Sequence, residues 1–137
     1  MLGEKMGDFR GKITGQRILQ SDGLVPKFET SAEISGTILG IEAKVMATYW
    51  SVLRPDGHLY GECPDQGVVI TKDGETATYR ASGLGKASGQ GSAVSFRGMA
   101  YFQTTSQKLA RLNEVAFAFE WDVDEHGDGR WQLWAWT

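Results

Sequence analysis

The sequence has one cysteine, three prolines and no long apolar run, and each scarcity excludes a class of protein. A lone Cys63 cannot form an intramolecular disulfide, which excludes the small secreted folds that disulfides hold together. No apolar stretch approaches the roughly 18 residues that a membrane-spanning helix requires. The amino-terminal segment is charged where a signal peptide needs an apolar core, which predicts a cytoplasmic location.

An excess of charge of either sign is also missing. The formal net charge is −3, and the basic residues are scattered rather than gathered in a stripe. Without such a stripe the chain cannot neutralise a phosphate backbone, so we expect no nucleic-acid partner. We also expect no membrane partner, because strands with a charged face, such as the one carrying Glu42 and Lys44, are not tolerated by lipid.

Glycine, in contrast, is abundant, with 18 residues in a chain of 137. The glycines follow no three-residue period, which excludes collagen, so they must serve turns and strands. The hydrophobic share of 41% and the charged share of 23% are those of an ordinary globular protein. At this length a single domain covering residues 1–137 is expected.

Apolar and polar residues alternate with a period of two through most of the chain, and this pattern predicts β-strands. In the run from Val115 to Val123, for example, every second residue is large and apolar. Eight strands are predicted in all, over residues 9–19, 28–38, 41–53, 59–71, 76–86, 94–103, 115–123 and 130–136.

Turn and helix signals separate these strands. Residues 54–58 and 88–92 have turn composition, and Asp-Gly within residues 72–75 favours a two-residue type I′ hairpin turn. Proline interrupts the fourth strand at residues 64–67, which predicts a β-bulge or a rim loop there. Residues 106–113 contain helix formers behind a Ser or Thr N-cap, so we expect about two helical turns.

Eight strands joined mostly by short loops predict an all-β fold, a closed antiparallel up-and-down barrel of about eight strands with one short helix near 106–113. Closure removes the exposed edges that would otherwise template aggregation. A two-sheet sandwich is the alternative architecture. An eight-stranded barrel is filled by side chains or holds one small ligand, and the glycine-rich strands would leave room for a ligand.

The sequence carries no recognisable catalytic or metal motif. His58 and His126 have no third ligand at a spacing typical of zinc. The run that begins at Asp122 resembles a calcium loop but has Leu133 where the bidentate acid belongs. We therefore expect neither a metal nor a cofactor. Cys63 is interpreted either as a nucleophile or acid, or as a small buried hydrophobe.

Two kinds of residue are candidates for binding a ligand. Tyr49 and Tyr79 fall on the apolar phase of their strands, where their hydroxyls either orient a ligand among aromatic rings or simply belong to the core. Glu62 and Arg97 would serve acid–base work only if the register turned them inward, and their phase suggests the outside. The full set of candidates is Tyr49, Glu62, Cys63, Tyr79, Phe96, Arg97, Phe117, Phe119 and Trp121.

The outward phase of several strands is also rich in large apolar residues. Seven of them share that phase, namely Met46, Trp50, Val52, Met99, Tyr101, Trp134 and Trp136. This is more aromatic surface than a monomer normally exposes to water. The sequence therefore predicts a homo-oligomer.

The strand order, the short helix after the sixth strand and the turns Arg54-Pro55-Asp56-Gly57 and Lys72-Asp73-Gly74-Glu75 resemble a small bacterial barrel of the allene oxide cyclase-like superfamily, which is similar in outline to lipocalins. The resemblance implies a compact, often oligomeric barrel. In some members the lumen binds a hydrophobic molecule and steers a cyclisation or isomerisation without a cofactor. Because no catalytic signature is shared, the resemblance assigns no functional residue.

Two functions therefore remain open from the sequence. The first is a barrel that binds a small apolar or amphipathic molecule in its lumen, with cyclase or isomerase activity as an extension. The second is a non-catalytic interaction domain that forms a homo-oligomer through its outer aromatic face.

Overall fold

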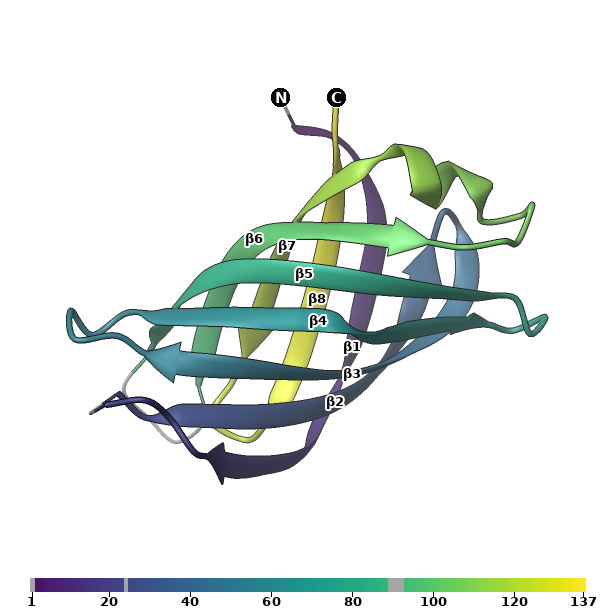
Figure 1. Ribbon diagram of the computed structural model, residues 1–137. Helices are drawn as coiled ribbons and strands as arrows, with labels where there is room; N and C mark the ends of the chain where they lie inside the picture. Colours follow the sequence, from purple (N-terminus) through teal and green to yellow (C-terminus); the bar gives the residue numbers. More distant parts are fainter. Residues whose placement is uncertain (1, 24, 89–92) are drawn as a thin grey trace.

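A computed structural model describes residues 2–23, 25–88 and 93–137 and shows eight antiparallel strands in one closed barrel (Figure 1). The strands are β1 (Leu2–Leu19), β2 (Lys27–Ile38), β3 (Ile41–Leu53), β4 (Leu59–Thr71), β5 (Thr76–Ala87), β6 (Val94–Gln103), β7 (Ala116–Val123) and β8 (Asp128–Trp136). Each strand pairs with its neighbour in the chain, and β1 also pairs with β8. The predicted up-and-down barrel is therefore confirmed, and the sandwich is excluded.

The first strand is longer than the sequence pattern predicts. It begins at Leu2 rather than near Phe9, because its early residues pair with β8, with Leu2 opposite Trp136 and Lys5 opposite Trp134. The register of this pairing shifts between Leu2 and Lys5 and again before Gly7. These irregularities break the period of two, so alternation alone did not detect this part of the strand.

The predicted interruption of β4 is a bulge inside a continuous strand. The register between β4 and β5 shifts between Cys63 and Gly67, and Asp65 within the bulge has a positive φ of 57°. Aspartate tolerates this left-handed conformation better than most residues. The Asp65 carboxylate accepts two hydrogen bonds from the Arg80 guanidinium, one of them at 3.1 Å from Nε, which ties the bulge to β5.

The prediction of a type I′ turn at residues 72–75 was wrong. A type I′ turn needs positive φ at both central residues, whereas Gly74 alone in this turn has one, at 85°. The Gly74 amide donates to the Thr71 carbonyl at 2.9 Å, and the Thr71 amide donates to the Glu75 carbonyl at 2.8 Å. The loop therefore carries one residue more than predicted, with Gly74 in the left-handed position. Of the turn predicted at residues 88–92, residues 89–92 lie outside the described residues.

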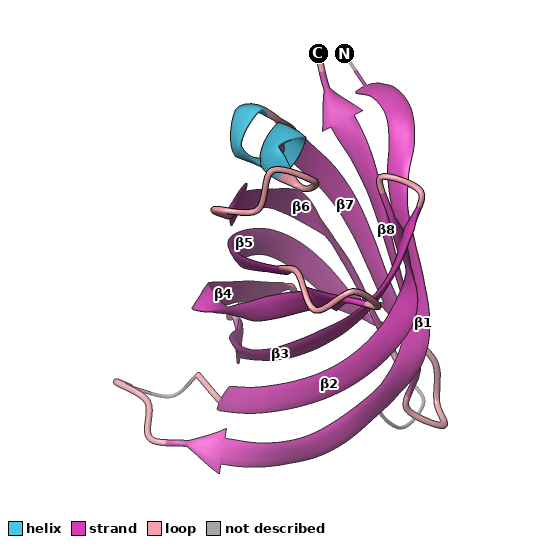
Figure 2. Ribbon diagram, turned by 90° about the vertical axis from the view of Figure 1, so that its right-hand side faces the viewer, coloured by secondary structure: helices cyan, strands magenta, loops and turns pink. Residues whose placement is uncertain are grey.

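The short helix exists, but it is a 3₁₀ helix, η1, over Ala110–Glu114 rather than two turns from residue 106. Leu109 precedes it without a side-chain cap, so the expected Ser or Thr N-cap is not formed. Leu109 and Leu112 are both fully buried and close one end of the barrel, where η1 sits beside β6 and β7 (Figure 2). Burial of these two leucines against the barrel end outweighs the local helical preference of the segment. No helix among the described residues is long and apolar enough to cross a membrane.

Aromatic rings occupy the space beside the inward glycines. A Cβ atom placed on Gly67 would lie 2.1 Å from the Tyr79 ring, and one on Gly129 would lie 2.4 Å from the Trp121 ring. The glycine-rich strands were expected to leave room for a ligand. At these two positions the room is taken by rings, whereas Gly61 and Gly83 line the cavity described below.

Other glycines allow neighbouring strands to approach closely. A Cβ atom on Gly98 would lie 1.9 Å from the carbonyl oxygen of Ser82, and one on Gly36 would lie 1.9 Å from that of Asp8. Backbone atoms cannot move away as a flexible side chain can. These two positions therefore permit the close strand contacts of the curved barrel wall.

A charged cluster lies on the outer side of the seam between β1 and β8. The Asp8 carboxylate accepts from Arg130 Nε at 3.1 Å and Nη2 at 2.8 Å, and from Lys5 Nζ at 2.8 Å. The hydrogen bonds from Arg130, followed by those from Lys5, lower the pKa of Asp8 to about 2. Asp8 therefore stays ionised at neutral pH and links the first strand to the last.

We expect Gly98→Ala to lower the free energy of unfolding by roughly 1–3 kcal/mol, because the added methyl group collides with backbone atoms of β5. Gly15→Ala is the matched control, since no atom lies within 4 Å of a Cβ at Gly15 and its φ is not positive. The control should be neutral or stabilising by up to about 1 kcal/mol. Urea unfolding measures both, and equal effects of the two substitutions would contradict the explanation.

Candidate functional site

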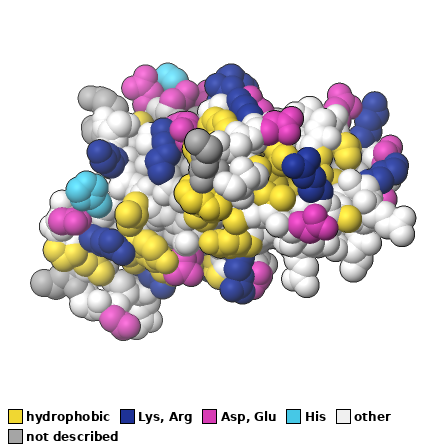
Figure 3. All heavy atoms as spheres, turned by 90° about the horizontal axis from the view of Figure 1, so that it is seen from above, with side chains coloured by type: hydrophobic (Ala, Val, Ile, Leu, Met, Phe, Trp, Pro, Cys, Tyr) yellow, Lys and Arg dark blue, Asp and Glu magenta, His cyan; other side chains and the backbone are white. Residues whose placement is uncertain are grey.

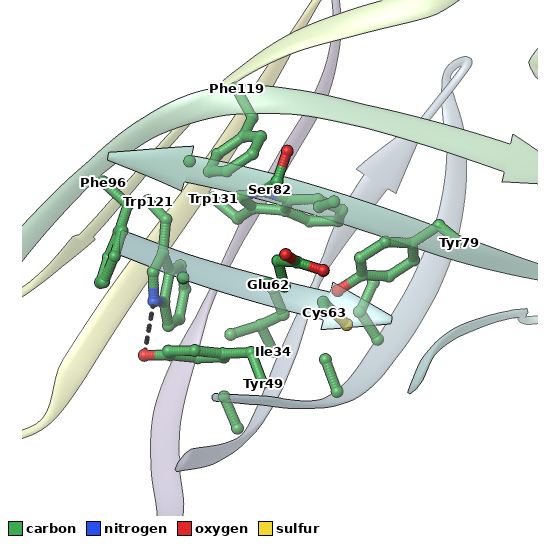
Figure 4. A pocket seen from close by; sticks show the side chains of 16 residues that line it. Ile34, Tyr49, Glu62, Cys63, Tyr79, Ser82, Phe96, Phe119, Trp121 and Trp131 are labelled. Carbon is green, nitrogen blue, oxygen red and sulfur yellow. Dashed lines mark hydrogen bonds between the residues drawn. The ribbon is translucent and has the colours of Figure 1, made fainter. Parts of the chain in front are cut away.

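The lumen contains a cavity in the middle of the barrel, called here the inner cavity (Figure 4). The volume open to the centre of a water molecule is about 70 Å³. Each water needs roughly 10–15 Å³ by this measure, so the space accommodates a few waters or a small organic group. The cavity is lined by Ala32, Ile34, Val45, Ala47, Tyr49, Gly61, Glu62, Cys63, Tyr79, Ala81, Ser82, Gly83, Phe96, Phe119, Trp121 and Trp131.

On one side the inner cavity ends at packed aromatic rings. Tyr79 stacks on Trp131 with ring centres 4.9 Å apart, and Tyr79 also meets Phe102 at 5.2 Å. Phe102 in turn contacts Phe117 edge to face at 5.4 Å. This aromatic core separates the cavity from the end of the barrel that Leu109 and Leu112 close.

Tyr79 and Cys63 are the buried polar pair of the inner cavity. Tyr79 is hydrogen-bonded to the Cys63 thiol, and both side chains are buried. Burial raises the pKa of Cys63 to about 11 and raises the pKa of Tyr79 well above its usual 10. At neutral pH both groups are therefore protonated, and neither supplies a thiolate or a phenolate to the cavity.

Tyr49 is the second tyrosine of the lumen. Trp121 Nε1 donates a hydrogen bond to its hydroxyl at 3.1 Å (Figure 4), and the Tyr49 ring meets Phe96 edge to face at 6.0 Å. Burial raises the pKa of Tyr49, so it too is protonated at neutral pH. The bond to Trp121 joins β3 to β7 across the interior.

Most of the candidate residues from the sequence analysis meet at this cavity. The ones whose side chains surround it are Tyr49, Cys63, Tyr79, Phe96, Phe119 and Trp121. Glu62 forms part of the wall, but its carboxylate accepts a hydrogen bond from Tyr60, 2.7 Å away, on the outward phase of β4.

Two of the candidates lie elsewhere. Arg97 is on the outer face, where Nη1 donates to Asp122 at 2.9 Å and Nε lies 3.8 Å from a Glu120 oxygen. Phe117 is fully buried, but it belongs to the aromatic core rather than to the cavity wall. These two residues do not take part in the candidate site.

Trp131 was missed by the sequence reasoning, which did not name it among the candidates for binding a ligand. It lies inward at 4% exposure and forms part of the cavity wall. Its alternation with Leu133 and Ala135, both of which are also buried, is the signal that would have identified it.

The chemistry of the inner cavity is that of a neutral binding pocket. Among the described residues, the groups that face the cavity are apolar except for uncharged hydroxyl and thiol groups, because the Glu62 carboxylate lies on the outward phase of β4, where it accepts from Tyr60. Within the described part of the chain, no group of three or more His, Cys, Asp and Glu residues is placed to hold a metal ion. The cavity is suited to an uncharged molecule that is held mainly by shape and apolar contact.

The outward apolar residues fall into two separate groups. On β3, Met46, Trp50 and Val52 lie apart from the others, and Lys27 Nζ covers the Trp50 ring at 4.7 Å. The second group forms two rows across β6, β7, β8 and β1, which we call the outer aromatic face. Its rows are Tyr101, Ala116, Trp136 and Leu2, and then Met99, Ala118, Trp134 and Lys5.

The outer aromatic face is partly open to solvent. Trp136 is 55% exposed and Tyr101 is 49% exposed. The space-filling view from above shows hydrophobic side chains grouped at the surface, with acidic and basic side chains around them (Figure 3).

We expect Cys63 to react with iodoacetamide at pH 8 at least about 100-fold more slowly in the folded protein than in the urea-unfolded chain. Raising the pKa from 9.0 to about 11 reduces the thiolate fraction at this pH by that factor. The rate should rise with pH up to the raised pKa. Mass spectrometry of the alkylated chain measures both rates, and the single cysteine gives a single product. Similar rates in the two states would show that the thiol is exposed and ionised.

No protein-family model and no curated protein matches the chain in sequence. Solved structures match it in fold. A conserved protein of unknown function from Rhodopseudomonas palustris superposes with a TM-score of 0.81 at 13% identity, covering 98% of this chain and 97% of that one. A protein of unknown function from Clostridium acetobutylicum superposes with a TM-score of 0.81 at 14% identity, covering 96% of each chain. The chain thus shares its whole eight-stranded barrel with these proteins.

Proposed function

We propose that the protein is a binding barrel that takes a small uncharged molecule into its lumen. The observation that carries the proposal is the inner cavity, about 70 Å³ of space in the centre of an otherwise packed barrel. Protein interiors are closely packed and rarely contain a void larger than a water molecule, because the atoms around an empty space lose van der Waals contacts. A cavity bounded by two tyrosine, two tryptophan and two phenylalanine rings is therefore a feature that ligand binding explains.

The electrostatics of the cavity restrict the ligand to neutral molecules. An ion moved from water into an apolar space needs a partner of opposite charge. No lysine or arginine of the described residues lines the inner cavity, and the Glu62 carboxylate is held by Tyr60 on the outward phase of β4. Tyr49, Cys63 and Tyr79 are protonated at neutral pH and serve as hydrogen-bonding groups. A molecule with an apolar body and at most one or two uncharged polar groups fits these walls.

Cyclase or isomerase activity is an extension of the same proposal, in line with the resemblance to the allene oxide cyclase-like superfamily. Neither Cys63 nor Tyr79 is ionised at neutral pH, so neither is available there as a base. Any catalysis in this cavity would rest on holding a reactive substrate in a productive conformation, with hydrogen bonds from these groups. Such a mechanism requires no cofactor.

Benzene is a suitable probe, because an apolar cavity of modest size takes it up. We expect saturable shifts of the indole N–H signals of Trp121 and Trp131 in ¹H–¹⁵N spectra, since both rings line the inner cavity. Trp50, Trp134 and Trp136 lie on the outward phase and serve as internal references. Equal shifts of all five indole signals, or no saturation, would overturn the proposal.

The matched variants are Ala81→Leu and Ala118→Leu. Ala81 lines the inner cavity, so leucine there should fill the space and weaken benzene binding at least tenfold. Ala118 lies on the outer aromatic face opposite Trp134, where the same change adds volume outside the barrel and should leave binding unchanged. If Ala81→Leu binds benzene as tightly as the wild type, the probe does not occupy this cavity.

A second candidate function is an interaction domain that pairs with a copy of itself. The outer aromatic face favours it, because its two rows place Tyr101 on β6 and Trp134 and Trp136 on β8, with only the alanines of β7 between them. Apolar patches of this kind commonly mark protein interfaces. The low net charge of −3 imposes little repulsion between two copies.

We expect the wild-type protein to sediment as a dimer or larger oligomer at micromolar concentration. Trp136→Lys should raise the dissociation constant of this oligomer at least tenfold. Trp136 is exposed, so this change leaves the core intact. Glu75→Lys, at an exposed turn remote from the face, is the control for added positive charge. A monomeric wild type would exclude this second function.

A further inference from the structure

A second, smaller cavity lies next to the inner cavity and is called here the outer cavity. Its open volume is about 40 Å³, by the same measure as for the inner cavity. Leu59 at the start of β4 and Val123 at the end of β7 both line it, which places it toward the end of the barrel where β3 turns into β4. The two cavities therefore follow one another along the lumen, with the outer cavity farther from η1.

Tyr49 and Phe96 separate the two cavities. They are the two residues that line both of them. The Tyr49 hydroxyl is held at this boundary by the hydrogen bond from Trp121 Nε1, 3.1 Å long. The wall between the two cavities thus consists of the Tyr49 ring, which is held in place through its hydroxyl, and the Phe96 ring beside it.

The walls of the two cavities differ in polarity. The inner cavity is almost entirely apolar, whereas Gln16, Thr30 and Ser51 line the outer cavity. Gln16 Nε2 donates to Thr30 Oγ1 at 3.2 Å, so these two side chains satisfy each other. In the described part of the chain, no lysine, arginine, aspartate or glutamate lines the outer cavity.

Ser51 is the unusual member of this wall. The residue is only 7% exposed, and its hydroxyl makes no hydrogen bond to any residue that the structure describes. The oxygen itself is not among the fully buried unpaired polar atoms, so it is open to the outer cavity that Ser51 lines. Buried polar groups in proteins are nearly always paired with another protein group, a water or a ligand. The Ser51 hydroxyl is open to the outer cavity and has no protein partner, so water or a ligand in that cavity supplies its hydrogen bond.

We propose that the two cavities form one binding site for an uncharged amphipathic molecule, whose polar end hydrogen-bonds to Ser51 and whose short apolar chain passes Tyr49 into the inner cavity. This inference rests on the proposed lumen-binding function and adds the class and orientation of the ligand. The polar end is a hydroxyl, carbonyl or amide, because a hydroxyl such as Ser51 both donates and accepts. An ionised head group does not fit, because among the described residues Glu62 is the one charged residue in either wall, and its carboxylate is held by Tyr60 on the outward phase of β4.

Entry of the chain requires the Tyr49 ring to turn aside. The turn breaks the hydrogen bond from Trp121 to the Tyr49 hydroxyl, so the Trp121 indole N–H reports directly on the passage. Trp131 lies farther in, stacked on Tyr79, and reports on arrival of the chain in the inner cavity. The two indole signals therefore separate the two events.

The test compares 1-hexanol, hexanoate and benzene as probes at pH 7 by the indole N–H signals. We expect 1-hexanol to shift both Trp121 and Trp131 with saturation, and hexanoate to bind at least tenfold more weakly. In Ser51→Ala, binding of 1-hexanol should weaken about fivefold or more, while binding of benzene stays within twofold of the wild type. Ser35→Ala, on the exposed outer phase of β2, is the matched control and should change neither affinity.

Three outcomes would overturn the inference. They are hexanoate binding as tightly as 1-hexanol, no Trp121 shift with 1-hexanol, and Ser51→Ala weakening benzene and 1-hexanol equally. If benzene binds normally in these cases, the proposed lumen-binding function survives and the amphipathic site alone fails. If benzene itself does not bind to the wild type, the proposed function has failed. Should Ser51→Ala not fold, Ser51→Cys, which is close in size and a weaker hydrogen-bonding group, provides the same comparison.

Discussion

Pairing of the first strand with the last is the constraint on which the rest of the structure depends. β1 and β8 share a ladder that runs from Leu2 opposite Trp136 to Lys12 opposite Asp128, and the Asp8 cluster adds ion pairs across the seam. Without this pairing both strands would present unpaired edges, and the lumen would open to solvent. Closure converts eight amphipathic strands into an enclosed interior, and an interior is a precondition for a binding cavity.

The size of the inner cavity depends on which lumen positions have an aromatic ring packed against a glycine. Tyr79 lies against Gly67, and Trp121 lies against Gly129, so large rings fit without pushing the strands apart. Where alanines face the lumen instead, as at Ala47 and Ala81, no ring covers them and space remains. The lumen is consequently packed toward η1 and hollow in the middle, with Tyr49 dividing the hollow part. A neutral interior with few polar groups is a binding surface for uncharged molecules.

Much of the architecture could be predicted from local patterns. Alternation with a period of two located all eight strands and assigned Tyr49 and Tyr79 to the interior, because side chains on a strand must alternate between its two faces. Proline at residue 64 located the bulge of β4, because proline cannot donate to the ladder. Local patterns were less informative where pairing is irregular, as in the first residues of β1, and where burial of Leu109 and Leu112 shaped η1.

The sequence by itself determined the strands and the all-β class, since these depend on neighbours in the chain. Only the tertiary structure decided which inward residues meet. Arg97 and Phe117 are removed from the site and Trp131 is added to it, because register and ring packing join residues far apart in sequence. The unpaired hydroxyl of Ser51 and the partition by Tyr49 likewise exist only when β3 faces β7 across a closed lumen. A cavity is a property of that three-dimensional packing, so no local pattern records it.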